Sequence, residues 1–295
     1  MNTKSAIHFS LIVATVNRVQ ETERLLASLS HQNYNGTFDV IIVDQNPDDR
    51  LNAMVERYQQ YFPITHLRQD QALLARARNQ GIAYMTGDYV SFPDDDCVYE
   101  VDTLSKAAQF LVEHAQYAGV VGNVLDLDCD EEAILLAPAP AAGVIDYDKA
   151  WMVGMTAAFF MHAKYVKNNR FDETIGPGTF WGCGEDADFL LRCMDQGATF
   201  YFTPQLVVRH PSPIKIYTTW QLAARYFRYG RGTGYLMGKR QFTVKTALKV
   251  IIEPLLMVGF FIANKRWKDL PSLPTTTLGR LIGYAGYYWT GNRSA

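Results

Sequence analysis

The first hundred residues alternate between short apolar runs and longer amphipathic stretches, and this alternation constrains the fold more than any other feature of the sequence. The runs are rich in Val, Ile, Leu, Thr and aromatic residues on both faces, as in strands buried within a parallel sheet. The stretches between them have a helical period. Repeats of strand and helix indicate βαβ units and therefore an α/β fold with a mostly parallel sheet. The predicted strands are 9–15, 38–44, 64–68 and 89–92, and the predicted helices are 19–30, 50–61 and 73–85.

Polar residues follow the carboxyl ends of these predicted strands. Asn17 and Arg18 come after the first strand, Asp44 ends the second, and three aspartates at 94–96 follow the fourth. Ligands of open α/β sheets bind outside the carboxyl ends of the strands. We therefore expect the functional site at this edge of the sheet.

The acidic triplet has the pattern of a cation site. In an extended chain Asp94 and Asp96 point to one face, about 7 Å apart, and Asp95 points to the other. Two carboxylates can bind a hard divalent cation, and ligation by oxygen favours Mg²⁺ or Mn²⁺ over zinc. Such a cation would neutralise a departing diphosphate group. The alternative is a solvated acidic turn, and the position after a buried strand favours the cation site.

A second acidic motif, GEDAD at 184–188, has the pattern of a helix start. Asp186 lies on the apolar face of this predicted helix, where the helix dipole favours the ionised carboxylate while burial opposes it. A carboxylate in that position can act as a general base. We expect Asp188 to pair with Arg192 one turn later. The alternative is an ordinary acidic first turn, which would explain Glu185 and Asp188 better than Asp186.

The charge of the chain is strongly polarised along its length. The net charge of -2 argues against a general nucleic-acid binder. Residues 1–211 contain 15 basic and 28 acidic side chains, whereas 212–295 contain 13 basic and two acidic ones. The basic residues of the second segment are interleaved with aromatic ones. This composition predicts a helical extension on an anionic membrane surface, and a helical cap on the catalytic domain is the compatible alternative. We therefore divide the chain into a catalytic domain at 1–211 and an extension at 212–295.

Cysteines and apolar stretches bear on the compartment. The four cysteines are scattered without CxxC spacing, which favours a reducing cytoplasm. The run at 6–16 resembles a signal-peptide core, but no small-residue cleavage site follows, so we interpret it as the first strand. We expect no stretch of about 20 uncharged apolar residues such as a spanning helix needs. The longest candidate, 254–264, is too short, so we expect peripheral association with the cytoplasmic face of the inner membrane.

Six motifs, in this order, resemble family 2 glycosyltransferases with the GT-A fold, over about 9–212. They are SLIVATVNR at 10–18, IIVD at 41–44, ARNQGI at 77–82, GDYVSF with PDDD at 87–96, FDE at 171–173, and GEDAD at 184–188. Ala14 stands where the family has proline and Val16 where it has an aromatic residue. The resemblance implies a Rossmann-like nucleotide-binding half fused to an acceptor-binding half, with a mixed, mostly parallel sheet.

The resemblance also implies an activity and the residues that perform it. In an inverting transfer, Asp186 would deprotonate an acceptor hydroxyl while Mn²⁺ or Mg²⁺ stabilises the departing nucleotide diphosphate. The donor would be a UDP- or dTDP-linked sugar, and the acceptor a glycan or polyprenyl-linked sugar. The implied nucleotide-sugar contacts are Thr15, Asn17, Arg18, Asp44, Arg78, Asp94 and Asp95. The implied metal ligands are Asp94, Asp96 and His210, and the implied acceptor contacts are Glu185 and Trp181.

Two other functions stay open beside this one. A sugar nucleotidyltransferase would need a glycine-rich loop after the first strand, and 15–18 contains no glycine. A dinucleotide oxidoreductase is disfavoured because the sequence has no GxGxxG at that place. A catalytically inactive nucleotide-sugar-binding protein would keep Asp44 and the acidic triplet but would not need Asp186.

Overall fold

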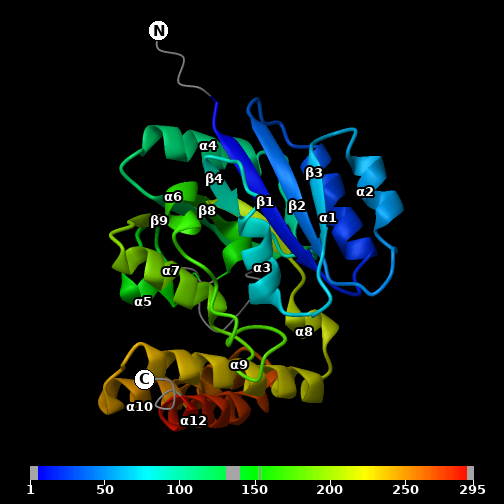
Figure 1. The fold of residues 1–295 in the computed structure, drawn as a ribbon. Helices are drawn as coiled ribbons and strands as arrows, with labels where there is room; N and C mark the ends of the chain where they lie inside the picture. Colours follow the sequence, from blue (N-terminus) through cyan, green and yellow to red (C-terminus); the bar gives the residue numbers. More distant parts are fainter. Residues whose placement is uncertain (1–5, 131–139, 152, 154, 291–295) are drawn as a thin grey trace. The chain divides into compact units, whose positions relative to one another are not determined.

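A mixed sheet forms the centre of the first part of the chain (Figure 1). The computed structural model describes residues 6–130, 140–151, 153 and 155–290. Within them the strand order is β3-β2-β1-β4-β8-β6-β9-β5, with β7 also paired to β9. The strands are β1 His8–Thr15, β2 Thr37–Asp44, β3 Ile64–Arg68, β4 Tyr89–Ser91, β5 Val98–Tyr99, β6 Gly119–Asp126, β7 Gly143–Val144, β8 Phe159–His162 and β9 Phe200–His210.

The first four strands confirm the predicted parallel arrangement. β1 pairs in parallel with β2 and β4, and β2 pairs in parallel with β3. β8 is antiparallel to both β4 and β6, whereas β6 and β9 are parallel. The sheet is therefore mixed beyond β4, which agrees with the mixed, mostly parallel sheet that the family resemblance implies.

Helices cover both faces of this sheet. They and the C-terminal helices are α1 Gln20–Ser30, α2 Asn52–Tyr58, α3 Leu74–Ile82, α4 Thr103–Glu113, α5 Tyr147–Ala150, α6 Ala163–Lys167, α7 Glu185–Asp195, α8 Pro213–Ile216, α9 Thr219–Lys239, α10 Val244–Leu256, α11 Val258–Ala263 and α12 Ser272–Thr290. Short 3₁₀ turns lie at Thr156–Ala158 and Trp267–Asp269. One face packs on α1, α2 and α4, and the other on α3, α6 and α7.

Strand β1 shows why these residues form a central strand. Leu11 and Val13 point into one apolar core, while Ile12 points into the other, and all three are fully buried. Each such side chain contributes about 1.5–3 kcal/mol when it leaves water. An apolar run on both faces is therefore stable here as a central strand, which confirms its interpretation as the first strand.

Helix α2 is shorter than the predicted 50–61. Asp48 accepts a hydrogen bond from the backbone N–H of Arg50 (3.3 Å) and forms an ion pair with its guanidinium. Local hydrogen bonds of this kind compete with helical ones. The helix accordingly begins at Asn52.

The chain divides into two compact units. The first comprises 1–171 and 189–211, and the second comprises 172–188 and 212–295. The break after Pro211 coincides with the predicted domain boundary, but 172–188 groups with the C-terminal helices. The assignment of 1–211 to catalysis and 212–295 to an extension stays a prediction.

In the second unit, α9 and α12 approach each other closely enough to require glycine. A Cβ on Gly283 would lie 2.0 Å from the carbonyl oxygen of Arg231, and one on Gly230 would lie 2.6 Å from that of Thr276. Side chains at these positions would force the two helices apart. The extension is thus a helical unit with its own tight packing, as the predicted helical character requires.

The expectation that 254–264 is the longest candidate for a spanning helix was wrong, although 244–263 is not an uncharged stretch. Segment Val244–Ala263, which comprises α10 and α11, is long and apolar enough to cross a membrane by length and composition, and most of it is exposed. The expectation considered only stretches of apolar residues that no charged residue interrupts. Lys245, Lys249 and Glu253 interrupt the stretch at intervals of four, so they share one helical stripe and leave the other faces apolar.

Candidate active site

The end of β9 meets the acidic triplet. Antiparallel pairing places Val98 of β5 opposite Arg209 of β9, so the next residue, His210, reaches the aspartates that precede β5. Nε2 of His210 lies 3.2 Å from Oδ1 of Asp96 and 4.0 Å from Oδ2 of Asp94. One potential ligand atom from each of these three residues lies within 4.8 Å of the others. The structure therefore brings the three predicted metal ligands together.

The donor set fits a divalent cation. It offers two carboxylate groups and one imidazole nitrogen, and Asp96 and His210 are buried while Asp94 is half-buried. Carboxylate oxygen suits Mg²⁺ and Mn²⁺, and a histidine ligand is also available to a transition metal. These three residues could hold Mn²⁺ or Mg²⁺.

Arg18 balances the charge of the triplet. Its guanidinium lies 2.6 Å from Oδ1 of Asp95 and 2.7 Å from Oδ2 of Asp96. Burial raises the pKa of Asp95 to about 6 although the charge of Arg18 opposes that shift. Burial alone would also raise the pKa of Asp96, but hydrogen bonding and charge from His210, together with Arg18, hold that pKa below its ordinary value. The pKa of Asp95 is therefore raised while that of its neighbour Asp96 is lowered.

Arg78 is a buried cation on the other side of Asp94. Its side chain is 2% exposed, and Nη2 lies 3.0 Å from Oδ1 of Asp94. The guanidinium carbon lies 5.2 Å from the ring centre of Phe171, which stacks on Phe189 with centroids 4.1 Å apart. The aromatic pair and the ion pair fix this arginine, so the site has a rigid positive group beside its acidic residues.

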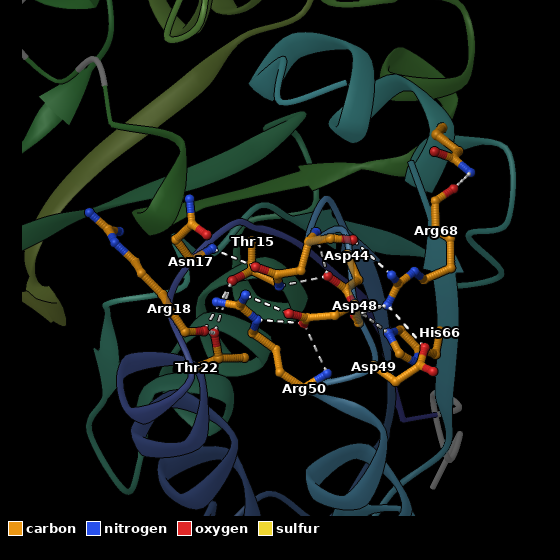
Figure 2. A network of polar contacts seen from close by, with 12 residues as sticks. Thr15, Asn17, Arg18, Thr22, Asp44, Asp48, Asp49, Arg50, His66 and Arg68 are labelled. Carbon is orange, nitrogen blue, oxygen red and sulfur yellow. Dashed lines mark hydrogen bonds and ion pairs between the residues drawn. The ribbon is translucent and has the colours of Figure 1, made fainter. Parts of the chain in front are cut away.

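Asp44 is the centre of a second polar network (Figure 2). The carboxylate is fully buried, and Oδ2 accepts hydrogen bonds from Arg68 (2.7 Å) and His66 (3.1 Å). Oδ1 accepts from the backbone N–H and the side-chain amide of Asn46, at 2.9 and 2.7 Å. Asp44 thus anchors the loop that follows β2 through these four hydrogen bonds.

This network joins the ends of β1 and β2. Asn17 has a left-handed backbone (φ 57°), and its N–H donates to Oδ1 of Asn46 at 2.7 Å (Figure 2). We had not predicted roles for Asn46 or Arg68. The signal was present, because Asn46 follows the second strand and Arg68 ends the third at the same edge of the sheet.

Thr15, the last residue of β1, is buried beside this network. Its side chain is 1% exposed, and Oγ1 lies 3.1 Å from Oγ1 of Thr22 (Figure 2). The hydroxyl therefore holds the end of β1 against α1. Contacts of Thr15, Asn17, Arg18 and Asp44 with a nucleotide sugar stay predictions.

The predicted base and acceptor residues lie in the second unit. Glu185 and Asp188 are buried, and Asp186 is half-buried, in the first turn of α7. Asp186, which was expected on the apolar face, is thus the least buried of the three carboxylates in this turn. The catalytic role of Asp186 and the acceptor contact of Glu185 stay predictions.

Lys239, which we had counted with the basic surface of the extension, is an internal cation. Its Nζ lies 2.6 Å from Oδ2 of Asp172 and 3.0 Å from Oδ1 of the fully buried Asp188. Arg192 donates to Oδ1 of Asn169 at 3.3 Å, and its expected pairing with Asp188 stays a prediction. The lysine thus links α9 to both acidic motifs of this unit.

Trp181 lies among aromatic side chains. Its ring stacks on that of Tyr235 with centroids 4.6 Å apart, and Phe180 meets it edge-on at 4.8 Å. These contacts fix the indole in one orientation, and Tyr235 covers one of its faces. A sugar would stack on the other face, and this acceptor contact also stays a prediction.

The sequence is similar to those of known glycosyltransferases. The family model described as "Glycosyl transferase family 2" matches residues 10–181. The poly(ribitol-phosphate) beta-N-acetylglucosaminyltransferase TarS of Staphylococcus aureus is 32% identical over 109 residues, which are 36% of this chain and 19% of that protein. The succinoglycan biosynthesis protein ExoM of Rhizobium meliloti is 24% identical over 257 residues, 83% of this chain and 80% of that protein.

Solved structures show the same fold. A mannosyltransferase from Pyrobaculum calidifontis, in complex with GDP-Man and Mn²⁺, has a TM-score of 0.66 at 14% identity and covers 94% of this chain and 88% of its own. S. aureus TarS 1-349 in complex with UDP-GlcNAc has a TM-score of 0.59 at 13% identity, with coverages of 95% and 92%. These likenesses confirm the GT-A fold predicted from the motifs.

Proposed function

Because this chain belongs to glycosyl transferase family 2, and is thus a glycosyltransferase, we propose that it moves one sugar, with inversion, from a nucleotide-diphospho-sugar to a hydroxyl of a glycan or lipid-linked acceptor. The donor is a UDP- or dTDP-linked sugar, and the likenesses to structures in complex with UDP-GlcNAc and with GDP-Man support a nucleotide-sugar donor. The likenesses to TarS and ExoM support a role in the assembly of bacterial surface glycans.

The observation that carries this proposal is the convergence of Asp94, Asp96 and His210 beside two arginines. A bound Mn²⁺ or Mg²⁺ would supply electrostatic stabilisation of the departing diphosphate. Arg18 and Arg78 add fixed positive charge at the same place, and charge that is held in advance of the reaction stabilises the developing anion without reorganisation. The neighbouring loop around Asp44 and Asn17 binds the nucleoside.

The acceptor is activated by Asp186. Its carboxylate takes the proton of the attacking hydroxyl as the new bond to the anomeric carbon forms and the bond to the diphosphate oxygen breaks. Asp186 lies in the first turn of α7 and is half-buried, so its carboxylate remains accessible to an acceptor hydroxyl. Attack opposite the leaving group inverts the anomeric centre, as in inverting glycoside hydrolysis.

The C-terminal helices attach the enzyme to an anionic membrane at the cytoplasmic face of the inner membrane. Leu248, Ile252 and Leu256 of α10 are exposed, and Lys245 and Lys249 are exposed beside them. Apolar side chains flanked by lysines suit a helix that lies in the membrane interface. The opposite side of α10 packs on α12 through residues such as Ala247 and Ile251, so this helix has one face for protein and one for lipid.

Asp186→Asn tests the mechanism. We expect this variant to lose transfer by several orders of magnitude while its melting temperature still rises with the nucleotide sugar and Mn²⁺, because donor binding belongs to other residues. Asp148→Asn, a change at an exposed carboxylate of α5, is the matched control. Near-normal turnover by Asp186→Asn would overturn the assignment of the base. Loss of the donor-induced shift would instead assign Asp186 to donor binding.

A further inference from the structure

Helix α9 carries a row of three arginines, Arg225, Arg228 and Arg231, spaced so that they follow one another along one side of the helix. In the described part of the chain, none of the three has an ion pair with a carboxylate or a side-chain hydrogen bond to a protein acceptor. Their recorded partners are aromatic rings. The guanidinium carbon of Arg225 lies 4.4 Å from the ring centre of Tyr229 and 5.5 Å from that of Tyr217.

Arg231 also contacts aromatic rings. Its guanidinium carbon lies 4.0 Å from the ring centre of Phe180 and 5.3 Å from that of Phe227. Its Nε is buried and has no hydrogen-bond partner among the described residues. Burial and the neighbouring charge of Arg228 lower the pKa of Arg231. Two cations therefore lie close together, and neither has an ion pair with a carboxylate in the described part of the chain.

Stacking on a ring leaves the donors of an arginine free for a ligand. The ring occupies one face of the planar guanidinium, whereas the five N–H groups point outward in its plane. A phosphate oxygen pair matches this fork and accepts two parallel hydrogen bonds. The aromatic contacts also hold the guanidinium in place beforehand, so less side-chain entropy is lost on binding.

The row lies against the loop that leads to the predicted acceptor residues. A Cβ on Gly232 of α9 would lie 1.9 Å from the carbonyl oxygen of Cys183, so that loop contacts the helix backbone directly. A Cβ on Gly182 would lie 3.5 Å from Cβ of Arg228. The next residues along this loop are Glu185 and Asp186. Cations and predicted acceptor residues thus lie on the same loop and helix of one compact unit.

We propose that Arg225, Arg228 and Arg231 bind a phosphate or diphosphate group carried by the acceptor. The inference rests on the proposed transfer to an acceptor and names its chemical class, a phosphorylated or diphosphate-linked sugar. A neutral glycan would leave three guanidinium groups without an anion. The site is distinct from the lipid-facing lysines of α10, which lie on a separate helix.

The proposal is tested by vesicle co-sedimentation with two kinds of anionic lipid. One set of phosphatidylcholine vesicles contains a polyprenyl diphosphate, and the other contains phosphatidylglycerol at equal surface charge. Arg228→Gln/Arg231→Gln is compared with Lys245→Gln/Lys249→Gln, which removes the same number of charges from α10. Arg228→Gln alone is a milder variant, because this exposed side chain packs against no ring in the described structure.

We expect Arg228→Gln/Arg231→Gln to weaken binding to the diphosphate vesicles by about tenfold or more, since two bidentate contacts are lost, and Arg228→Gln alone to weaken it less. Both variants should leave phosphatidylglycerol binding unchanged. The lysine variant should show the opposite preference. Inorganic diphosphate should compete for the diphosphate vesicles with wild-type protein. Equal losses on both vesicles would identify a headgroup site and overturn the acceptor assignment, as would normal diphosphate binding by the arginine variants.

Two further measurements separate this proposal from the proposed function. The melting shift with nucleotide sugar and Mn²⁺ should be unchanged in the arginine variants, because donor-binding residues lie elsewhere. Selective diphosphate binding without sugar transfer from any donor would contradict the proposed function and leave the phosphate site intact. Transfer to a diphosphate-linked acceptor with unchanged kcat/KM in Arg228→Gln/Arg231→Gln would contradict the site and leave the function intact.

Discussion

Replacement of Lys239 by methionine should destabilise the second unit strongly. Lys239 bridges Asp172 and Asp188, and the Asp188 side chain has 0% exposure while Asp172 and Lys239 have 23% and 27%. Methionine keeps most of the apolar stem of the lysine but removes the ammonium group. The buried carboxylate of Asp188 then loses the cation that is 3.0 Å away.

The magnitude follows from the burial of the pair. Removal of one partner from a buried ion pair costs about 3–5 kcal/mol because it leaves an uncompensated charge. The partial exposure of Lys239 and Asp172 places this case near 3 kcal/mol, at the lower end of that range. For a unit of about 100 residues that unfolds by itself, such a loss lowers the melting midpoint by roughly 12 °C.

Tryptophan fluorescence is the suitable measurement. Four of the five tryptophans, at 181, 220, 267 and 289, lie in the second unit, so their signal reports its unfolding. Lys245→Met, at an exposed lysine of α10, is the matched control and should melt like the wild type. Lys239→Met/Asp188→Asn should recover part of the loss because it removes the buried charge that Lys239 had neutralised. A melting midpoint for Lys239→Met equal to that of the control would refute the reasoning.

The same cluster predicts a pH dependence. Burial alone would raise the pKa of Asp172, but hydrogen bonds from Lys239 and Thr174 hold it below its ordinary value of 3.8. A lowered folded-state pKa contributes stability above the unfolded pKa, and this stability is lost as the pH falls through the folded pKa. Acidification below about pH 4 should therefore destabilise the wild type more than Lys239→Met.

Three further predictions concern other parts of the molecule. Asp96→Asn, or an excess of chelator, should reduce transfer by orders of magnitude in a coupled assay, and full activity in chelator would contradict a metal site. Arg68→Met should destabilise the protein by about 2–3 kcal/mol in thermal melts, since it leaves Asp44 buried without its cation, and a neutral outcome would show that His66 and Asn46 suffice. Leu256→Asp, at a side chain that is 77% exposed, should release the protein from anionic vesicles without lowering its melting temperature, and unchanged sedimentation would count against a lipid-facing α10.

The alternation of apolar runs and amphipathic stretches determined the βαβ half of the fold. Strand β3 has the predicted bounds, and β1 and β2 differ from theirs by one residue. These elements follow from local periodicity, because a strand that buries both faces has no other stable environment. The same pattern placed the acidic triplet at the carboxyl edge of the sheet, where it lies.

Local sequence patterns did not predict the contacts between segments that lie far apart in the chain. His210 approaches Asp96 because β9 pairs with β5 in a particular antiparallel register, and sequence alone does not specify that register. The family resemblance had suggested His210. Asn46 and Arg68 were not predicted, although both donate hydrogen bonds to Asp44. Each of these partners belongs to a different strand or loop from the group that it contacts.

The basic segment 212–295 shows most clearly what the sequence determines and what only the tertiary structure decides. Its composition determined that 212–295 would be helical and cationic, because counts of charge and aromatic residues need no coordinates. The tertiary structure decided what each cation does. Lys239 neutralises the carboxylates of Asp172 and Asp188, Arg231 contacts two aromatic rings, and Lys245 is exposed. A positive charge has the same sign in every sequence, but its role depends on which groups the fold places within a few ångströms of it.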